Sequence, residues 1–340
     1  MQKLELESKL TIKKLSLAKL ALILFISSEL CYYLLIAQTG IVEYFASDIF
    51  AIAPLPIGGI VGSFLTYFLK ISNEKKIKLF LLLQLSMSFF YPDLSILMLF
   101  ILGIAVGALA PLLINELKKA SLLDLGFSLA ISYVVGTFLF NYEVALRGDI
   151  AIGLSILTIL SSSFLPKEES SEVKQSNYQE YPLFVMVLWI FLDSALFETL
   201  SRDITISIWR DGYSLEIALF HILGVFTALN YKMQKHKKEL FIIILFALSY
   251  LFYFLQESFI LSLVYPFVIS YYNVAILQTI MKKDLKVISV YMIFIGWMAS
   301  GAGLYIALES LILFVPIIFL VALLIVINKQ QSQNKELTYA

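Results

Sequence analysis

The chain has 340 residues, of which 60% are hydrophobic and only 15% are charged, and its mean hydropathy is +0.88. These values exclude an ordinary soluble domain, because a chain so rich in apolar side chains cannot stay dispersed in water. The formal net charge is zero, and we expect no nucleic-acid partner.

Long apolar segments follow one another along the whole chain. A membrane-spanning helix needs roughly 20 apolar residues, and twelve such helices use most of the sequence, so no soluble domain fits beside them. The predicted spans are residues 17–38, 46–69, 78–91, 94–116, 121–141, 149–165, 182–200, 213–231, 240–255, 258–280, 287–307 and 310–328.

The first predicted span resembles a secretory signal, because lysines precede an apolar run. The run is longer than the apolar part of a signal peptide, about 7 to 15 residues, and no small-residue cleavage site follows it. We therefore predict a membrane anchor. Cys31, the only cysteine, lies inside this run without a disulfide partner, and we expect it to be a packing residue.

The basic residues divide unevenly between alternate loops. All 22 lysines lie in the tails or in every second loop, whereas the three arginines, Arg147, Arg202 and Arg210, lie in the intervening loops. The positive-inside rule assigns the lysine-rich side to the cytoplasm. We predict that both termini are cytoplasmic, that the number of spans is even, and that the chain lies in the cell (plasma) membrane.

A polar segment, residues 166–181, interrupts the apolar pattern at the middle of the chain. It has no apolar periodicity, which is typical of a flexible linker; a partner-binding segment is the alternative. The segment leaves six predicted spans on each side. We predict an N-terminal half of residues 1–165, a cytoplasmic linker, and a C-terminal half of residues 182–340.

An internal repeat supports this division. Residues 62–70 match residues 224–232 at an offset of 162, and residues 117–119 match residues 281–283 at an offset of 164. Six spans are an even number, so both halves enter the membrane from the same side and the repeat is parallel. The predicted fold class is an all-α polytopic membrane protein with twelve transmembrane helices in two parallel six-helix pseudo-repeats.

Twelve spans in two parallel halves, a polar central linker and cytoplasmic termini together resemble the major facilitator superfamily. In that family the loop after the second span carries a glycine, an acid, an arginine and two basic residues. Here Gly62 and the pair Lys75-Lys76 match, but Thr66 and Tyr67 stand in place of the acid and the arginine. The glycine and proline signature of the fifth span in antiporters is also missing. The resemblance implies a divergent, reduced member.

Two acidic residues lie near the middle of predicted spans. Glu29 is about 12 residues into the first span and Asp193 about 11 residues into the seventh, which is near the midplane at 1.5 Å per residue. The offset of 164 makes them equivalent. Ionisable side chains at this depth are expensive and are functional by default, so we predict a substrate or proton-coupling role. The alternative is that either acid only bonds a neighbouring hydroxyl, such as that of Ser28.

His221 lies near the middle of the eighth predicted span, where a proton relay and a neutral packing role are equally compatible with the sequence. Glu198 and Glu216 lie near the outer ends of their spans, and we expect them in a water-filled vestibule. The resemblance implies that the first, fourth, seventh and tenth spans border a central cavity. The residues that we expect to line it, with aromatic packing as the alternative, are Tyr32, Tyr33, Asn115, Trp189, Tyr272, Asn273 and Gln278.

The sequence places no basic side chain at membrane depth, and a cavity with acids alone repels anions. We therefore predict a monomeric secondary active transporter of a cationic or neutral small molecule, coupled to protons, in which the lipid bilayer surrounds the chain. The alternative is a non-transporting or lipid-handling membrane protein on a transporter-like scaffold. An enzyme is not expected, because metal-ligand spacings, a Walker loop and a nucleophile elbow are all missing, and we expect neither a cofactor nor a metal.

Overall fold

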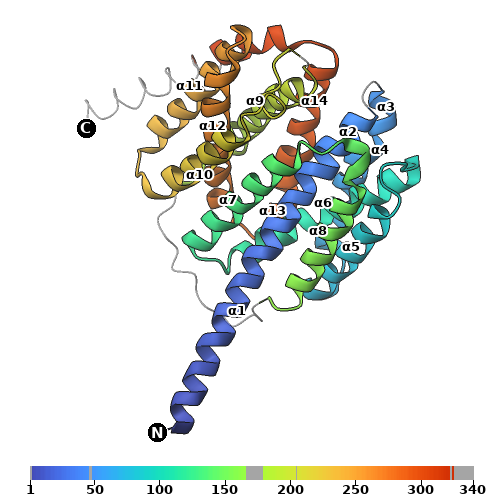
Figure 1. Cartoon of the computed structure of the whole chain (residues 1–340), viewed down its shortest axis with the longest axis vertical. Helices are drawn as coiled ribbons and strands as arrows, with labels where there is room; N and C mark the ends of the chain where they lie inside the picture. Colours follow the sequence, from blue (N-terminus) through green and yellow to red (C-terminus); the bar gives the residue numbers. More distant parts are fainter. Residues whose placement is uncertain (1, 46–47, 166–178, 204, 322–323, 325–340) are drawn as a thin grey trace. The chain divides into compact units, whose positions relative to one another are not determined.

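The computed structural model describes residues 2–45, 48–165, 179–203, 205–321 and 324, with side chains from Leu17 onward. All regular elements in these ranges are helices (Figure 1). The helices pack into two compact units, one of residues 1–178 with 277–297, the other of residues 179–276 with 298–340. We call these unit 1 and unit 2.

Unit 1 contains the helices of the first half of the chain and part of a later helix. Its elements are α1 (Gln2–Tyr32), η1 (Tyr33–Gly40), α2 (Ile41–Tyr44), α3 (Ile49–Ile52), α4 (Pro54–Phe68), α5 (Asn73–Ser88), α6 (Ile96–Leu117), α7 (Leu122–Leu139), η2 (Val144–Leu146), α8 (Arg147–Ser162), α13 (Leu285–Met292) and most of η3 (Ile293–Ala299). Here α1 packs against α7 and α8, α5 packs against α6 and α8, and α4 lies along α6.

Unit 2 contains the remaining helices, among which α9 packs against α11 and α14. Its elements are α9 (Leu183–Arg202), α10 (Ser214–Asn230), α11 (Lys235–Phe254), α12 (Ser258–Ile280), α14 (Ser300–Leu308) and η4 (Ile312–Phe314). The chain passes into unit 1 at Leu277, near the end of α12, and returns to unit 2 at Met298. The units therefore differ from the two predicted halves at residues 277–297, which belong to unit 1. The division of the chain into two six-helix halves stays a prediction. Of the predicted linker, residues 166–178 lie outside the described residues.

Eight described helical segments are long and apolar enough to cross a membrane. They are Leu17–Tyr44, Ile49–Phe68, Ile96–Leu117, Leu122–Leu139, Val144–Ser162, Leu183–Arg202, Ser258–Ile280 and Leu285–Leu308. The apolar helices Ser214–Asn230 and Ile312–Val321 are shorter, and α5 and α11 begin with charged residues. The chain is thus a multi-pass helical membrane protein, and twelve spans stay a prediction.

Helix ends follow local sequence signals. Ser121 caps α7: its hydroxyl accepts from the backbone N–H of Asp124, and the Asp124 carboxylate accepts from the Ser121 N–H over 2.9 Å. This reciprocal pair satisfies two N–H groups that a helix start leaves without partners. Ser95 and Asp284 cap α6 and α13 in the same way, each with one side-chain acceptor.

Helices α4 and α6 approach closely because glycines face each other. A Cβ atom on Gly62 would collide with the carbonyl oxygen of Ile104, and one on Gly107 would collide with the backbone of Gly59. The close approach lets the Ser63 hydroxyl donate across to the Gly107 carbonyl over 3.0 Å. Small residues at such positions are typical of helix packing in membranes, where apolar burial alone does not bring helices together.

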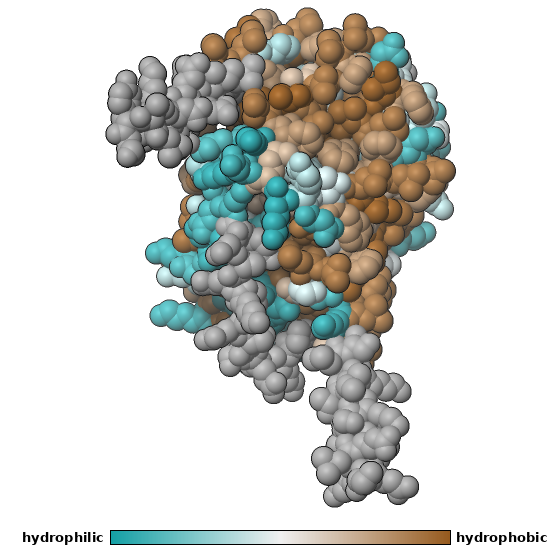
Figure 2. All heavy atoms as spheres, turned by 90° about the vertical axis from the view of Figure 1, so that its left-hand side faces the viewer, coloured by the Kyte–Doolittle hydropathy of each residue, from teal (hydrophilic) through white to brown (hydrophobic). Residues whose placement is uncertain are grey.

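The surface carries large apolar side chains, as expected for a protein surrounded by lipid. Phe50, Ile96 and Leu313 are 84%, 71% and 70% exposed. Figure 2 shows one face on which hydrophobic residues, drawn in brown, cover large areas. A soluble monomer rarely exposes such areas, whereas hydrocarbon solvates them.

Candidate functional site

Glu29 lies in α1 and is buried in unit 1. Its Oε2 atom accepts a hydrogen bond of 3.0 Å from Nε2 of Gln84, on α5. The Ser28 hydroxyl instead bonds the Leu24 carbonyl and, over 2.8 Å, the hydroxyl of Thr158 on α8. The sequence-based alternative, in which Glu29 bonds Ser28, is therefore wrong in its choice of partner. The carboxylate is held by a helix that lies more than 50 residues further along the chain.

The Glu29–Gln84 pair belongs to a buried polar network that joins three helices. Nε2 of Gln84 lies 3.5 Å from the Ser155 hydroxyl on α8, and that hydroxyl lies 3.5 Å from the hydroxyl of Ser88 on α5. The Ser88 hydroxyl is also 2.9 Å from the hydroxyl of Tyr32. Tyr32, predicted to line a cavity, thus points into this network and is completely buried.

Asp193 lies in α9 and is half-buried in unit 2. Its two carboxylate oxygens accept from two tyrosines of α12: Tyr265 donates to Oδ1 over 2.9 Å and Tyr272 to Oδ2 over 2.6 Å. The single hydroxyl hydrogen of Tyr265 is shared with the Asp193 backbone carbonyl, 3.0 Å away. Nearby, Tyr250 donates to the Leu192 carbonyl over 2.8 Å. Asp193 is therefore a carboxylate framed by phenol hydroxyls.

The two acids, which the predicted repeat makes equivalent, contact different helices. Glu29 bonds an amide from the third predicted span, whereas Asp193 bonds two phenols from the tenth. Spacing along the chain fixes depth, but it does not fix which neighbour a side chain meets. Each acid is described within its own unit, and their predicted opposition across a substrate path stays a prediction.

His221 is buried in α10, and its Nδ1 atom lies 2.7 Å from the hydroxyl of Ser270 on α12. The backbone of Pro266 is a second hydrogen-bond partner of the ring. The residue therefore ties α10 to the proline-bearing part of α12. These contacts fit a packing histidine and equally a relay, so its role stays a prediction.

The other residues that we predict to line a cavity have diverse surroundings. Tyr33 is half-buried, with its ring edge-on to that of Trp297 at 6.3 Å, and Asn115 accepts from Lys118 over 3.1 Å. Trp189 is completely buried against Tyr181, ring centroids 5.0 Å apart. Asn273 is half-buried and Gln278 buried.

Glu198 differs from its predicted vestibule environment, because its side chain is buried and pairs with Arg202 over 3.5 Å. Asp203, the next residue along the chain, follows the end of α9. Burial by itself would raise the pKa of its carboxyl group, but hydrogen bonds from the Thr205 side chain and N–H and from the Tyr253 hydroxyl lower it on balance. Glu216 lies in the first turn of α10 and is half-buried.

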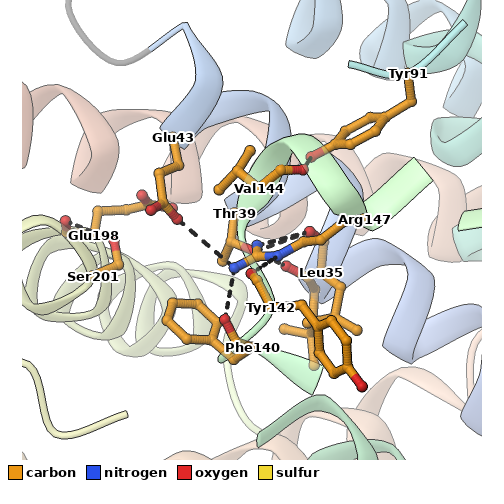
Figure 3. Close-up of polar contacts among 11 residues, drawn as sticks. Leu35, Thr39, Glu43, Tyr91, Phe140, Tyr142, Val144, Arg147, Glu198 and Ser201 are labelled. Carbon is orange, nitrogen blue, oxygen red and sulfur yellow. Dashed lines mark hydrogen bonds and ion pairs between the residues drawn. The ribbon is translucent and has the colours of Figure 1, made fainter. Parts of the chain in front are cut away.

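Arg147 is a buried charged residue whose surroundings the sequence did not reveal. We placed it in an outer loop, but it opens α8 inside the apolar segment Val144–Ser162, and its side chain is completely buried. The assignment of Arg147 to a loop is therefore wrong, and the expectation that no basic side chain lies at membrane depth stays a prediction. Figure 3 shows the guanidinium among backbone carbonyls near Thr39. A signal was present, since only three of 25 basic residues are arginine, the cation that best satisfies several oxygens at once.

The guanidinium of Arg147 is occupied by its own unit. Nε donates to the Tyr142 carbonyl (3.1 Å), Nη2 to the Phe140 carbonyl (2.8 Å), and Nη1 to the Leu35 carbonyl (3.3 Å) and the Thr39 hydroxyl (3.1 Å). Leu35 and Thr39 belong to η1, a π-helical stretch that continues α1. The arginine therefore donates to a carbonyl and a hydroxyl of a π-helical stretch, where the backbone hydrogen-bond pattern differs from that of a regular α-helix.

Among the described residues, no cluster of three or more His, Cys, Asp or Glu side chains could hold a metal ion. The chemistry that the described polar groups offer is proton binding and cation binding at two carboxylates. The sole cysteine is buried, as predicted.

Comparison with known proteins gives a fold but no close relative. No protein-family model matches the chain, and no curated protein matches its sequence. It is similar to the crystal structure of the human organic anion transporter MFSD10 (TETRAN), with a TM-score of 0.57 and 13% identity over 88% of this chain and 93% of that chain.

A bacterial homolog of the human lysosomal transporter Spinster, inward-facing and unoccupied, is similar with a TM-score of 0.50 and 13% identity over 87% of this chain and 82% of that chain. The major facilitator superfamily transporter FucP, in an outward conformation, has a TM-score of 0.47 and 13% identity over 89% and 97% of the two chains. The first two similarities support the fold that the span pattern predicts. The chain is a multi-pass membrane protein with a divergent fold of the major facilitator superfamily type.

Proposed function

We propose that the chain is a secondary transporter, which moves a cationic or neutral small molecule across the cell membrane by alternating access and uses protons as the coupling ion. It acts as a monomer of twelve spans with both termini in the cytoplasm. The observation that carries the proposal is that each unit has a carboxylate near the middle of an apolar span, Glu29 in one and Asp193 in the other. Each is hydrogen-bonded to side chains of another helix.

The cost of burying such groups supports a functional role. Placing an ionisable side chain within a membrane costs at least a few kcal/mol, and apolar residues could pack the same helices without that cost. Carboxylates that meet only neutral donors are suited to binding and releasing a proton. Asp193 is half-buried, and its two phenol donors leave the negative charge in place for a cation.

The buried Arg147 does not favour an anionic substrate. Its donors are directed at three backbone carbonyls and at Thr39, so they serve the fold of unit 1. The organic anions in the name of the similar human transporter belong to that protein. For this chain, the described acids favour a cation or a neutral molecule.

One observation favours the second candidate, a non-transporting or lipid-handling protein. Thr66, in place of the acid of the loop motif, is buried and donates to the Ala108 carbonyl over 2.9 Å. Tyr67, in place of the arginine, is exposed, with Lys286 5.3 Å above its ring. A charged gate at this loop is therefore replaced by packing, which a protein without a transport cycle would tolerate.

The test begins with the purified protein and a thermal-shift screen of organic cations and neutral compounds at two pH values, because a bound ligand raises apparent stability. Compounds that stabilise the protein are then assayed for uptake into proteoliposomes under an imposed pH gradient. We expect uptake that follows the gradient and is lost in Asp193→Asn. Uptake that is unchanged when the gradient is collapsed contradicts proton coupling, and uptake that is unchanged in Asp193→Asn contradicts the role of Asp193.

A further inference from the structure

We propose that Glu29 and Gln84 form the proton-binding pair of this protein, in which the side-chain amide of Gln84 turns over when Glu29 takes up a proton. The inference rests on the proposed function, and it adds a positioning residue, Gln84, that the sequence pattern did not single out. It also gives the two acids different tasks: Glu29 binds the proton, and Asp193 faces the substrate.

The geometry in the present state fits an ionised Glu29. Gln84 directs its amide nitrogen, a donor, at Oε2 of Glu29 over 3.0 Å. Its amide oxygen, Oε1, is buried and has no hydrogen-bond partner among the described residues. A buried amide oxygen without a partner costs about 1–3 kcal/mol. This orientation of the amide is therefore favourable only if Glu29 requires a hydrogen-bond donor at the position of Nε2. An ionised carboxylate, which only accepts hydrogen bonds, provides that need.

Protonation reverses the requirement. A new O–H bond on Glu29 turns one carboxyl oxygen from an acceptor into a donor. Rotation of the Gln84 amide by about 180° then brings Oε1, now without a partner, to the position that Nε2 occupies, where it accepts that hydrogen bond. The balance is simple: one proton is gained by Glu29, no other covalent bond changes, and the formal charge of the pair goes from −1 to zero.

The remaining members of the network can follow this change. Ser155, Ser88 and Tyr32 connect to the pair through hydroxyl groups, each of which donates or accepts according to its rotation. When the Gln84 amide has turned over, Oε1 lies where Nε2 was, and the Ser155 hydroxyl donates a hydrogen bond to it. Since these hydroxyls come from α1, α5 and α8, the protonation of one carboxylate reorients bonds between three packed helices.

In the described part of unit 1, no fixed positive charge competes for Glu29. The Tyr32 hydroxyl, which is neutral at ordinary pH, is a titratable group that interacts electrostatically with Glu29. On the packed helices, Lys76 bonds the Thr66 carbonyl, Glu116 pairs with Lys119, Asp124 caps α7, and Arg147 bonds backbone carbonyls. The other titratable groups described on α1, α5, α6, α7 and α8 are Lys19, Cys31, Glu74, Lys75, Lys78, Tyr133 and Asp149. Glu29 therefore meets amide and hydroxyl groups, which adapt to either charge state.

Asp193 has a different environment. Both its oxygens accept from phenols, and its side chain is half-buried, whereas Glu29 is 4% exposed. Each of its phenol partners has one hydroxyl hydrogen, and that of Tyr265 also serves the backbone. The more exposed acid is the one that a substrate can reach, and the enclosed acid with an adaptable amide partner is the one suited to a proton alone.

The test is a pH titration of the purified full-length protein by difference infrared spectroscopy, which follows the carbonyl stretch of protonated carboxyl groups and uses protons as the only ligand. Subtracting the spectra of Glu29→Gln isolates the Glu29 band. Gln84→Met keeps the side-chain length and removes the amide, so both charge states of Glu29 lose a hydrogen bond. We expect the band to form about one pH unit higher, because the bond to the charged carboxylate is the stronger of the two.

The frequency of the band tests the reversal of the amide. If protonated Glu29 donates to Oε1, Gln84→Met removes that acceptor, and the band moves to higher frequency. Gln84→Asn is the second variant, used in case Gln84→Met does not fold. Its side chain is one methylene shorter, so its amide does not reach Glu29, and we expect the same shifts. Ser86→Ala, an exposed change on the same helix, should alter neither midpoint nor frequency.

A midpoint in both Gln84 variants equal to that of the unmodified protein overturns the proton-binding pair, and an unchanged band frequency overturns the reversal. The titration does not depend on transport. If the titration behaves as expected but uptake ignores the pH gradient, the proposed function is wrong and the proton-binding pair remains. If uptake follows the gradient but no band depends on Glu29, this inference is wrong and the proposed function remains.

Discussion

Arg147 and Thr39 meet in the buried interior of unit 1, where Nη1 of the arginine donates to the threonine hydroxyl over 3.1 Å (Figure 3). The same nitrogen bonds the Leu35 carbonyl, so the first turn of α8 holds the π-helical continuation of α1. Together with the Tyr142 and Phe140 carbonyls and the Glu43 carboxylate 3.9 Å away, these contacts explain how a full positive charge is tolerated in an apolar segment. Its role is to hold two helices together.

Replacing Arg147 should therefore destabilise the protein strongly. In Arg147→Met three backbone carbonyls lose a charged donor, and we expect a loss of about 3 kcal/mol, visible as a lower melting temperature in detergent. Arg147→Lys should recover only part of it, because an ammonium group cannot reproduce the planar fork. The exposed Arg210→Met is the control, and equal melting temperatures for Arg147→Met and Arg210→Met would contradict this role.

The close packing of α4 and α6 predicts a contrast between two glycines. Gly62→Ala introduces a Cβ that meets the Ile104 carbonyl, so we expect a loss of about 2 kcal/mol. Gly153→Ala has open space around its Cβ and should be neutral or should stabilise α8 by up to about 1 kcal/mol. Thermal unfolding of both variants checks the prediction, which fails if the two substitutions have the same effect.

Lys76 predicts a second contrast, between adjacent lysines. Its ammonium group is buried and donates to the Thr66 carbonyl over 2.7 Å, close to the end of α4, while Lys75 is exposed. Burial lowers the pKa of Lys76. We expect Lys76→Met to lower the melting temperature by removing a donor to a helix C-terminus, and Lys75→Met to leave it unchanged. A larger effect at Lys75 would show that surface charge dominates.

Two adjacent tyrosines of α12 allow a test of whether the Asp193 site binds substrate or only packs helices together. Tyr272 donates to the Asp193 carboxylate, whereas the hydroxyl of Tyr271 is buried without a hydrogen-bond partner among the described residues. Tyr272→Phe should weaken the apparent affinity for the transported compound about tenfold, equivalent to about 1.4 kcal/mol. Tyr271→Phe should have little effect. The measurement is concentration-dependent uptake into proteoliposomes, and a loss confined to Tyr271→Phe would exclude this assignment.

Asp203 predicts a pH-dependent contribution to stability. Its pKa in the folded protein is lowered on balance by the bonds from Thr205 and Tyr253, so it stabilises the fold above its unfolded pKa of about 3.9 and this contribution is lost as pH falls through the folded value. Asp203→Asn should lower the melting temperature modestly at pH 7. The difference from the unmodified protein should shrink below about pH 4 and vanish below the folded pKa. The exposed Asp149→Asn serves as the control, and a constant difference at all pH values would count against the mechanism.

Several features of the fold were predictable because they depend on neighbouring residues. Apolar length predicted helices that the structure contains, such as Ile96–Leu117 and Ser258–Ile280. The burial of Cys31 followed from its position in an apolar run. The repeat placed Glu29 and Asp193 in spans at equivalent positions, and both lie in apolar helices.

The partners of these residues were not predictable to the same extent. Ser28, adjacent to Glu29, was the example of a partner in the packing alternative, but a helix turns successive side chains to different directions, and Ser28 bonds Thr158. Arg147 was assigned to a loop because a charge at the edge of an apolar segment normally marks its end. Its burial depends on carbonyls from η1 and from the end of α7, which no local pattern at Arg147 encodes.

The sequence by itself determined that this protein is helical and lies in a membrane, because the length of an apolar segment is a local property of the chain. Only the tertiary structure decided which groups meet. Gln84 reaches Glu29 across 55 residues of chain, and Tyr265 and Tyr272 reach Asp193 across 72 and 79. Such pairs depend on how helices pack and rotate, so the chemistry of each acid is set by residues distant in sequence.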